Sequence, residues 1–203
     1  FDALIDGLGS QWEVLNNTYK PYPCGVVLNP VIQACLELHQ PYVEYGGDPN
    51  AIDYIEIIGN PLLRQRTDRA NPRTGRESQV SGQHAVGVCL LRGKAGLPEF
   101  SDASVMDSSI QKIGAKLKFV DDPSLAVESV KINLKYKNNP VISKDIKFAK
   151  GSLQDPLSDQ DLEQKLRDLV IYGKPSFHPD ALIEKIWSLE KLDDIRQLID
   201  LLN

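Results

Sequence analysis

The stretch Tyr19-Lys20-Pro21-Tyr22-Pro23-Cys24-Gly25 leads, after three intervening residues, into Asn29-Pro30 at the start of a helical pattern. Each proline fixes its own φ angle and restricts the residue before it, while the glycine frees the backbone. We therefore predict a stiff, irregular loop and then a helix, with Asn29 as N-cap and Pro30 as first residue. Lys20 then lies near the positive end of a helix, where an ammonium is disfavoured. It is either a proton-transferring residue or an exposed loop lysine, the usual state of this side chain.

The composition is typical of a globular domain. The chain has 203 residues, of which 41% are hydrophobic and 25% charged, so a sizeable core is possible. A net charge of -5 argues against a nucleic-acid surface. The apolar runs are too short to span a bilayer, and three cysteines without C-x-x-C spacing indicate neither disulfides nor a zinc site. We expect a cytoplasmic protein with no metal or other cofactor and no nucleic-acid or membrane partner.

The hydrophobic periodicity predicts an α+β fold in three parts. Residues 1–11 have the pattern of the end of a helix, and residues 12–150 mix strands with helices. Residues 151–203 are helical throughout and begin with a capping box between Ser158 and Asp161. We therefore predict a small α+β domain over 12–150, flanked by segments of a separate helical layer.

Several elements of the mixed part can be placed. Trp12–Leu15 has the pattern of a short strand, and Glu77–Leu91 that of a helix with many small residues. Ile52–Ile58 is rich in β-branched residues and predicts a strand covered on both faces. Alternation over Val130–Tyr136, then the turn signal at Lys137–Pro140 and a further alternating segment, predicts an antiparallel hairpin.

The sequence lacks the phosphate-binding glycine pattern, H-E-x-x-H and G-x-S-x-G. Weaker candidates are left. His84 lies on an apolar stripe and is either a core histidine or a catalytic one. Cys24, near a helix N-terminus that lowers a thiol pKa, is either reactive or a buried inert cysteine. A group of arginines either grips substrate carboxylates or lies in a solvated loop; it comprises Arg64, Arg66, Arg69, Arg73 and Arg76.

Five tracts follow one another along the chain: Tyr19–Pro30, Asn60–Leu63, Pro72–Ser78, Gln83–Gly93 and Phe100–Asp102. Their order resembles the MmgE/PrpD family, most closely over residues 19–102 and weakly through the later strands and helices. The resemblance implies the C-terminal half of a two-domain enzyme. An α+β domain would then be inserted before the last helices of an all-helical domain, whose first part we expect upstream of Phe1.

The resemblance also implies an activity. Enzymes of this family remove or deliver a proton at a carbon next to a carboxylate, which needs no organic cofactor. Lys20 is then the catalytic residue of the α+β domain, facing acid/base groups of the N-terminal helical half. The substrate is a small di- or tricarboxylic acid, and we also expect a homodimer. Residues expected to contact the substrate are Tyr22, Cys24, Arg66 and His84.

Two departures from the family pattern bear on the reaction. Many relatives carry histidine where this chain has Asn29, which removes a possible proton donor. The decarboxylases carry an active-site tyrosine where Gln65 and Arg66 stand here. We therefore favour an epimerase resembling iminodisuccinate epimerase. The alternatives are a lyase, resembling 2-methylcitrate dehydratase or cis-aconitate decarboxylase, and a non-catalytic interaction or dimerisation fragment.

Overall fold

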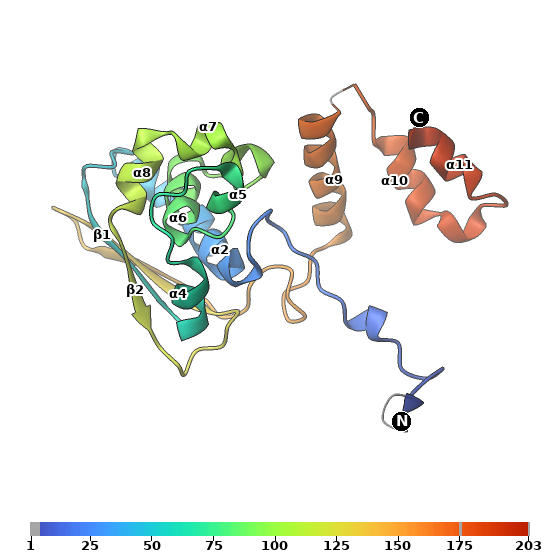
Figure 1. Cartoon of the computed structure of the whole chain (residues 1–203), viewed down its shortest axis with the longest axis horizontal. Helices are drawn as coiled ribbons and strands as arrows, with labels where there is room; N and C mark the ends of the chain where they lie inside the picture. Colours follow the sequence, from blue (N-terminus) through green and yellow to red (C-terminus); the bar gives the residue numbers. More distant parts are fainter. Residues whose placement is uncertain (1–4, 175, 203) are drawn as a thin grey trace. The chain divides into compact units, whose positions relative to one another are not determined.

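The computed structural model describes residues 5–174 and 176–202. The chain divides into two compact units, Phe1–Leu157 and Ser158–Asn203 (Figure 1). The first unit runs to Leu157, and the predicted end of the α+β domain at residue 150 stays a prediction. Within the described residues, no helix combines the length and apolar character needed to cross a membrane.

A four-stranded mixed sheet lies at the centre of the first unit. Its strands are β1 (Ile52–Gly59), β2 (Leu117–Asp121), β3 (Val130–Tyr136) and β4 (Val141–Ile146), in the order β2-β1-β3-β4. β1 pairs with β2 in parallel and with β3 antiparallel. The predicted hairpin is confirmed, since β3 and β4 are antiparallel. With helices on the sheet and in the second unit, the predicted α+β class is confirmed.

The two faces of the sheet differ. On one face Ile55 of β1 lies opposite Leu134 of β3, and both are fully buried. On the other face Asn133 donates to Glu56 Oε2 (2.7 Å) and accepts from Ser143 Oγ (2.7 Å). This second face is a partly exposed, hydrogen-bonded polar row. The prediction that β1 is covered on both faces is therefore wrong within this chain.

Helices cover the apolar face of the sheet (Figure 1). α2 packs against β3 and β4, and α6 packs against both α2 and α8. The α-helices whose bounds the structure describes in this unit are α2 (Asn29–Glu37), α3 (His39–Glu44), α4 (Pro61–Thr67), α5 (Gly75–Ser78), α6 (Gly82–Arg92), α7 (Asp102–Val105) and α8 (Ser108–Gly114). The 3-10 turns are η1 (Glu13–Asn16), η2 (Val26–Leu28) and η3 (Leu97–Phe100).

Local structure departs from the sequence predictions at three points. The expected strand Trp12–Leu15 is the 3-10 turn η1. Asn29 has helical dihedral angles and lies inside α2, because the preceding turn η2 already brings Leu28 into helical conformation as N-cap. The expected helix Glu77–Leu91 is split in two, because the Ser81 hydroxyl accepts from the backbone N–H of His84 (3.1 Å) and starts α6 afresh.

The second unit is helical, as predicted. It contains α9 (Asp159–Gly173), α10 (Asp180–Trp187), η4 (Leu189–Lys191), α11 (Arg196–Ile199) and η5 (Asp200–Leu202). The predicted capping box is confirmed: the Ser158 N–H donates to Asp161 Oδ2 (2.8 Å), and the Asp161 N–H donates to Ser158 Oγ (3.2 Å). Among the described residues of this unit, only Leu182 and Ile183 are buried apolar side chains.

Candidate active site

An open hollow of about 610 Å³ lies between two segments of the first unit, the Lys20 loop and the chain around α5. This size falls within the roughly 300–1,000 Å³ of sites that bind small molecules. The hollow is lined by Lys20, Pro23, Cys24, Gly25, Arg76, Glu77, Gln79 and Val80. It therefore combines a lysine, an arginine and a carboxylate with an apolar wall.

The two walls of the hollow are joined by backbone contacts. The N–H of Gly25 donates to the carbonyl oxygen of Gln79 (2.8 Å), which ties the Lys20 loop to the end of α5. The N–H of Gly75 donates to Asp102 Oδ1 (2.6 Å) and fixes the start of α5. Gly75 admits no side chain, because a Cβ would overlap the carbonyl oxygen of Phe100. The position of α5 is thus set from both ends.

Gly151 supports the Lys20 loop from another side. Its φ angle of +86° lies in the left-handed region that favours glycine. A Cβ at this position would overlap the carbonyl oxygen of Tyr19 and lie 3.0 Å from Cδ of Pro21. The loop predicted to be stiff from its prolines is therefore also held by close packing against a later part of the chain.

Lys20 and Arg76 are the cationic residues among the described ones that line the hollow. Both are exposed. Arg76 Nη1 donates to Gln79 Oε1 (2.9 Å). The carboxylate of Glu77 has a hydrogen-bond partner nearby in the sequence, since its Oε2 accepts a hydrogen bond from the backbone N–H of Arg73 (2.7 Å). The hollow thus offers two positive groups and one negative group that already has a hydrogen-bond donor.

Cys24 contributes a buried thiol to the wall. It is 3% exposed, and its Sγ lies 3.7 Å from Oδ1 of Asn29. Burial raises the pKa of Cys24 to about 12, although the positive charge of Lys20 acts to lower it. The effect of burial on the thiol pKa outweighs the lowering expected from a helix N-terminus. At neutral pH this cysteine is therefore a protonated thiol and a poor nucleophile.

Two further predicted site residues lie elsewhere. Tyr22 is half-buried and packs against the hydrophobic core, and burial raises the pKa of its hydroxyl. Arg66 is exposed on α4. Neither is among the residues that line the hollow. Their contact with substrate stays a prediction.

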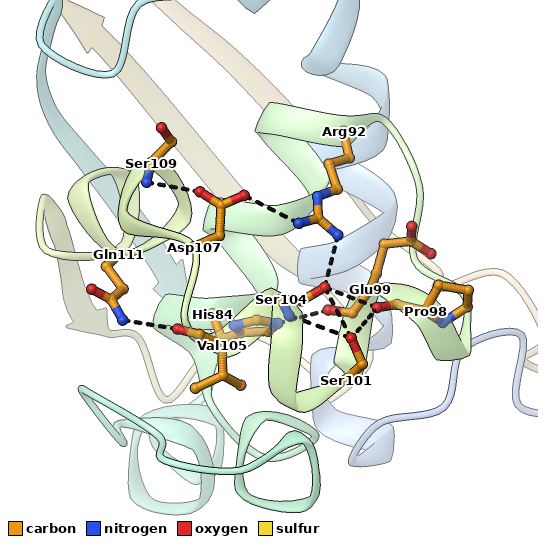
Figure 2. Close-up of polar contacts among 10 residues, drawn as sticks. All are labelled: His84, Arg92, Pro98, Glu99, Ser101, Ser104, Val105, Asp107, Ser109 and Gln111. Carbon is orange, nitrogen blue, oxygen red and sulfur yellow. Dashed lines mark hydrogen bonds and ion pairs between the residues drawn. The ribbon is translucent and has the colours of Figure 1, made fainter.

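His84 lies in the first turn of α6, and its side chain is buried. Figure 2 shows its ring beside residues of the segment 98–111. Its Nε2 lies 2.8 Å from the carbonyl oxygen of Glu99. Because a carbonyl only accepts hydrogen bonds, Nε2 carries the proton. Burial lowers the pKa of His84, and the positive charge of Arg92 lowers it further. The hydrogen bond to Glu99 acts in the opposite direction but does not cancel these effects. His84 is therefore neutral near pH 7.

The surroundings of His84 are those of a structural histidine. Arg92 donates to Ser104 Oγ (2.7 Å) and to Asp107 Oδ2 (3.1 Å), which fastens the segment 98–111 onto α6 (Figure 2). The hollow beside His84 measures about 40 Å³. It is far below the roughly 300 Å³ at which small-molecule sites begin. A role of His84 in substrate contact stays a prediction.

Sequence reasoning did not select Arg76, Gln79 or Val80 for the site. Arg76 was named only as one member of the arginine group, and no local pattern separates it from its neighbours. What distinguishes it is the hydrogen bond between Gly25 and Gln79, a contact that no sequence period predicts. Within the described residues, no cluster of three or more metal-ligating side chains was found.

Together, the fold and the hollow define an α+β domain with an open hollow lined by Lys20 and Arg76. The model of the MmgE/PrpD C-terminal domain matches residues 22–189. The chain therefore belongs to the MmgE/PrpD family, whose members are generally enzymes of the dehydratase or isomerase type. Lys20 lies just before the matched range. No curated protein matches the chain significantly.

Proposed function

We propose that Lys20 is one of two proton-transfer groups in a cofactor-independent enzyme that moves a proton at the α-carbon of a small di- or tricarboxylate. The observation that carries this proposal is that Lys20 and Arg76 line one hollow of suitable size. The second proton-transfer group would come from the N-terminal helical half expected upstream of this chain. The predicted homodimer and cytoplasmic location belong to the same proposal.

The chemistry assigns separate tasks to the two cationic residues. To take a proton from carbon, Lys20 must act as the neutral amine. Arg76 supplies a positive charge in the same hollow. Loss of the α-proton places enolate-like charge on the adjacent carboxylate, which a fixed cation stabilises. For epimerisation, the second proton-transfer group then delivers a proton to the opposite face of the carbon, while Lys20 holds the proton it took as an ammonium. In the reverse direction the two groups exchange these tasks.

We favour epimerisation over dehydration. Dehydration requires an acid aimed at the leaving hydroxyl, whereas epimerisation requires only one proton-transfer group on each face of the carbon. Asn29 occupies the position of a possible donor, but its amide does not titrate in this range, and its Oδ1 lies 3.7 Å from the thiol of Cys24. This arrangement supports an epimerase, with a dehydratase as the alternative.

The test is α-proton exchange in heavy water, in the complete enzyme, with a panel of small dicarboxylates. Replacing the amine in Lys20→Met should abolish incorporation of deuterium into the stereoisomer whose α-proton faces Lys20, while circular dichroism shows that the fold is retained. Lys94→Met removes another exposed lysine of the same unit, away from the hollow, and should exchange as the wild type does.

Exchange that persists unchanged in Lys20→Met would remove Lys20 from the mechanism. An unsaturated product, seen as a rise in ultraviolet absorbance with citrate-like substrates, would instead assign the enzyme to the lyases. Wild-type protein that exchanges none of the panel and forms no unsaturated product would favour the non-catalytic alternative.

A further inference from the structure

The arginines of the first unit differ in how many hydrogen bonds their guanidinium groups make within the fold. Arg64 donates from Nε and Nη2 to the carboxylate of Asp121, at 2.6–3.0 Å. Arg92 is held by Ser104 and Asp107. Both guanidinium groups therefore already have hydrogen-bond partners within the folded chain.

Arg76 is different. Within the described part of the chain, its side chain makes one hydrogen bond, from Nη1 to Gln79 Oε1 at 2.9 Å. A guanidinium has five N–H donors in a planar fork, so most of its donors stay available. Since Arg76 lines the hollow, these donors are accessible to a small molecule bound beside Lys20.

Glu77 is the acidic residue among the described ones that line the hollow. Its Oε2 accepts the backbone N–H of Arg73 (2.7 Å), while its own N–H donates to Thr74 Oγ1 (3.2 Å). Glu77 thus completes the N-terminal cap of α5, and no ion pair between Glu77 and Arg76 is present among the described residues. Among the described residues, two cationic side chains and one carboxylate therefore line the hollow.

Gln79 couples Arg76 to the Lys20 loop. Its carbonyl oxygen accepts the N–H of Gly25 (2.8 Å), and its side-chain oxygen accepts from Arg76 (2.9 Å). The same residue therefore holds the loop and orients the guanidinium. A group fixed before binding loses less conformational freedom when the ligand arrives, which improves its contribution to affinity.

From these contacts we propose that Arg76 binds a carboxylate of the substrate and sets the preference of the hollow for short dicarboxylates, an inference that rests on the proposed function of Lys20. The planar guanidinium matches a carboxylate through two parallel hydrogen bonds. Pro23 and Val80 provide apolar surface beside it for a short carbon chain. Lys20 lines the same hollow as this proposed carboxylate site.

The experiment measures binding, separately from turnover, in the complete enzyme. Succinate and citrate are titrated as unreactive di- and tricarboxylate probes, with propionate for comparison. Arg76→Ala should weaken succinate binding by at least about tenfold, as expected for loss of a charge-assisted hydrogen-bonded pair. Arg76→Lys should recover part of the affinity, because it restores the charge without the fork.

Two matched variants separate Arg76 from general charge effects. Arg73→Ala removes an exposed arginine three positions away that does not line the hollow, and its affinity should stay within about twofold of the wild type, as is usual for a screened exposed charge. Arg66→Ala tests the arginine that the sequence selected. Thermal unfolding of each variant identifies any loss of fold.

The inference is overturned if Arg76→Ala binds succinate as the wild type does, if Arg66→Ala alone loses affinity, or if neither probe binds the wild-type enzyme better than propionate. These outcomes leave the proton-exchange test of Lys20 unaffected. Conversely, exchange that survives Lys20→Met, together with binding lost in Arg76→Ala, would reject the proposed function and retain the carboxylate site.

Discussion

At the scale of single residues, glycines that leave no room for a Cβ position the Lys20 loop and α5. Gly151 packs on the backbone of Tyr19, and Gly75 packs on that of Phe100. Neither contact can be predicted from the sequence, because both join segments far apart along the chain. The prolines around Lys20 do predict a stiff loop, but the direction of that loop depends on these packing contacts.

Gly151→Ala should destabilise the first unit and displace the Lys20 loop. The left-handed φ alone costs a non-glycine residue about 1–2 kcal/mol, and forcing a methyl group into packed backbone adds about 1–3 kcal/mol. Gly46→Ala is the matched control, since its φ is +95° and a Cβ there meets nothing within 4 Å. Urea unfolding of both variants measures the difference. Equal losses would show that Gly151 is not closely packed.

The buried His84 should make the first unit less stable in mild acid. Burial lowers the pKa of His84 in the folded state, whereas in the unfolded chain it is about 6.5. As the pH falls through 6.5, the unfolded chain therefore takes up a proton that the folded chain resists. The free energy of unfolding then decreases as the pH falls, by up to about 1.4 kcal/mol per pH unit.

Urea unfolding at pH 7.5, 6.5 and 5.5 checks this dependence. His84→Gln removes the titrating group but keeps an amide that can donate to the Glu99 carbonyl, so its stability should vary less over the same range. Carboxylates with lowered pKa values, such as Asp107, lose their contribution only in stronger acid. Parallel curves for the two proteins would contradict a buried, neutral His84.

At the scale of elements, α6 and α8 pack closely because each places a glycine against the other's backbone. A Cβ on Gly87 of α6 would lie 2.5 Å from the carbonyl oxygen of Ile110, and one on Gly114 of α8 would lie 2.6 Å from that of Gln83. The small residues of the segment 77–91 predict a helix that can approach its neighbours. The sequence does not say that α8 would be the neighbour.

Gly87→Ala should therefore destabilise the protein by about 2 kcal/mol, because the added methyl group must push the helices apart. In an exposed helix the same change usually stabilises by up to about 1 kcal/mol. Gly173→Ala in α9, where a Cβ meets nothing within 4 Å, provides that comparison. A stabilised Gly87→Ala protein would mean that the two helices are not in close contact.

Elements defined by local signals were predicted better than pairings between distant segments. The hairpin of β3 and β4 follows from alternation on both sides of one turn, and the start of α9 follows from Ser158 and Asp161. The parallel pairing of β1 with β2 joins segments separated by several helices, so no local sequence pattern predicts this pairing. Arg76 was missed for the same reason, since its role depends on the contact between Gly25 and Gln79.

At the scale of the whole molecule, the two units bury very different amounts of apolar surface. The first has a contiguous core under the sheet, with Ile55, Ile57, Ile132 and Leu134 fully buried. In the second, α9 has no buried residue, and apolar side chains such as Trp187, Ile195 and Ile199 are exposed. Local stability follows such burial, so it should differ between the units.

Amide hydrogen exchange of the 203-residue chain should show this difference directly. The amides of β1 and β3 are hydrogen-bonded within a buried sheet and should exchange slowest, near the limit set by global unfolding. Those of α9, α10 and α11 should exchange faster, because few apolar contacts oppose local opening. In a longer chain that includes the predicted N-terminal helical half, exchange in these helices should slow while that of β1 changes little. Suppose instead that α9 is as protected as β1 in the 203-residue chain. The helices of the second unit would then have packing partners within this chain, and the proposal that they belong to a separate helical domain would fail.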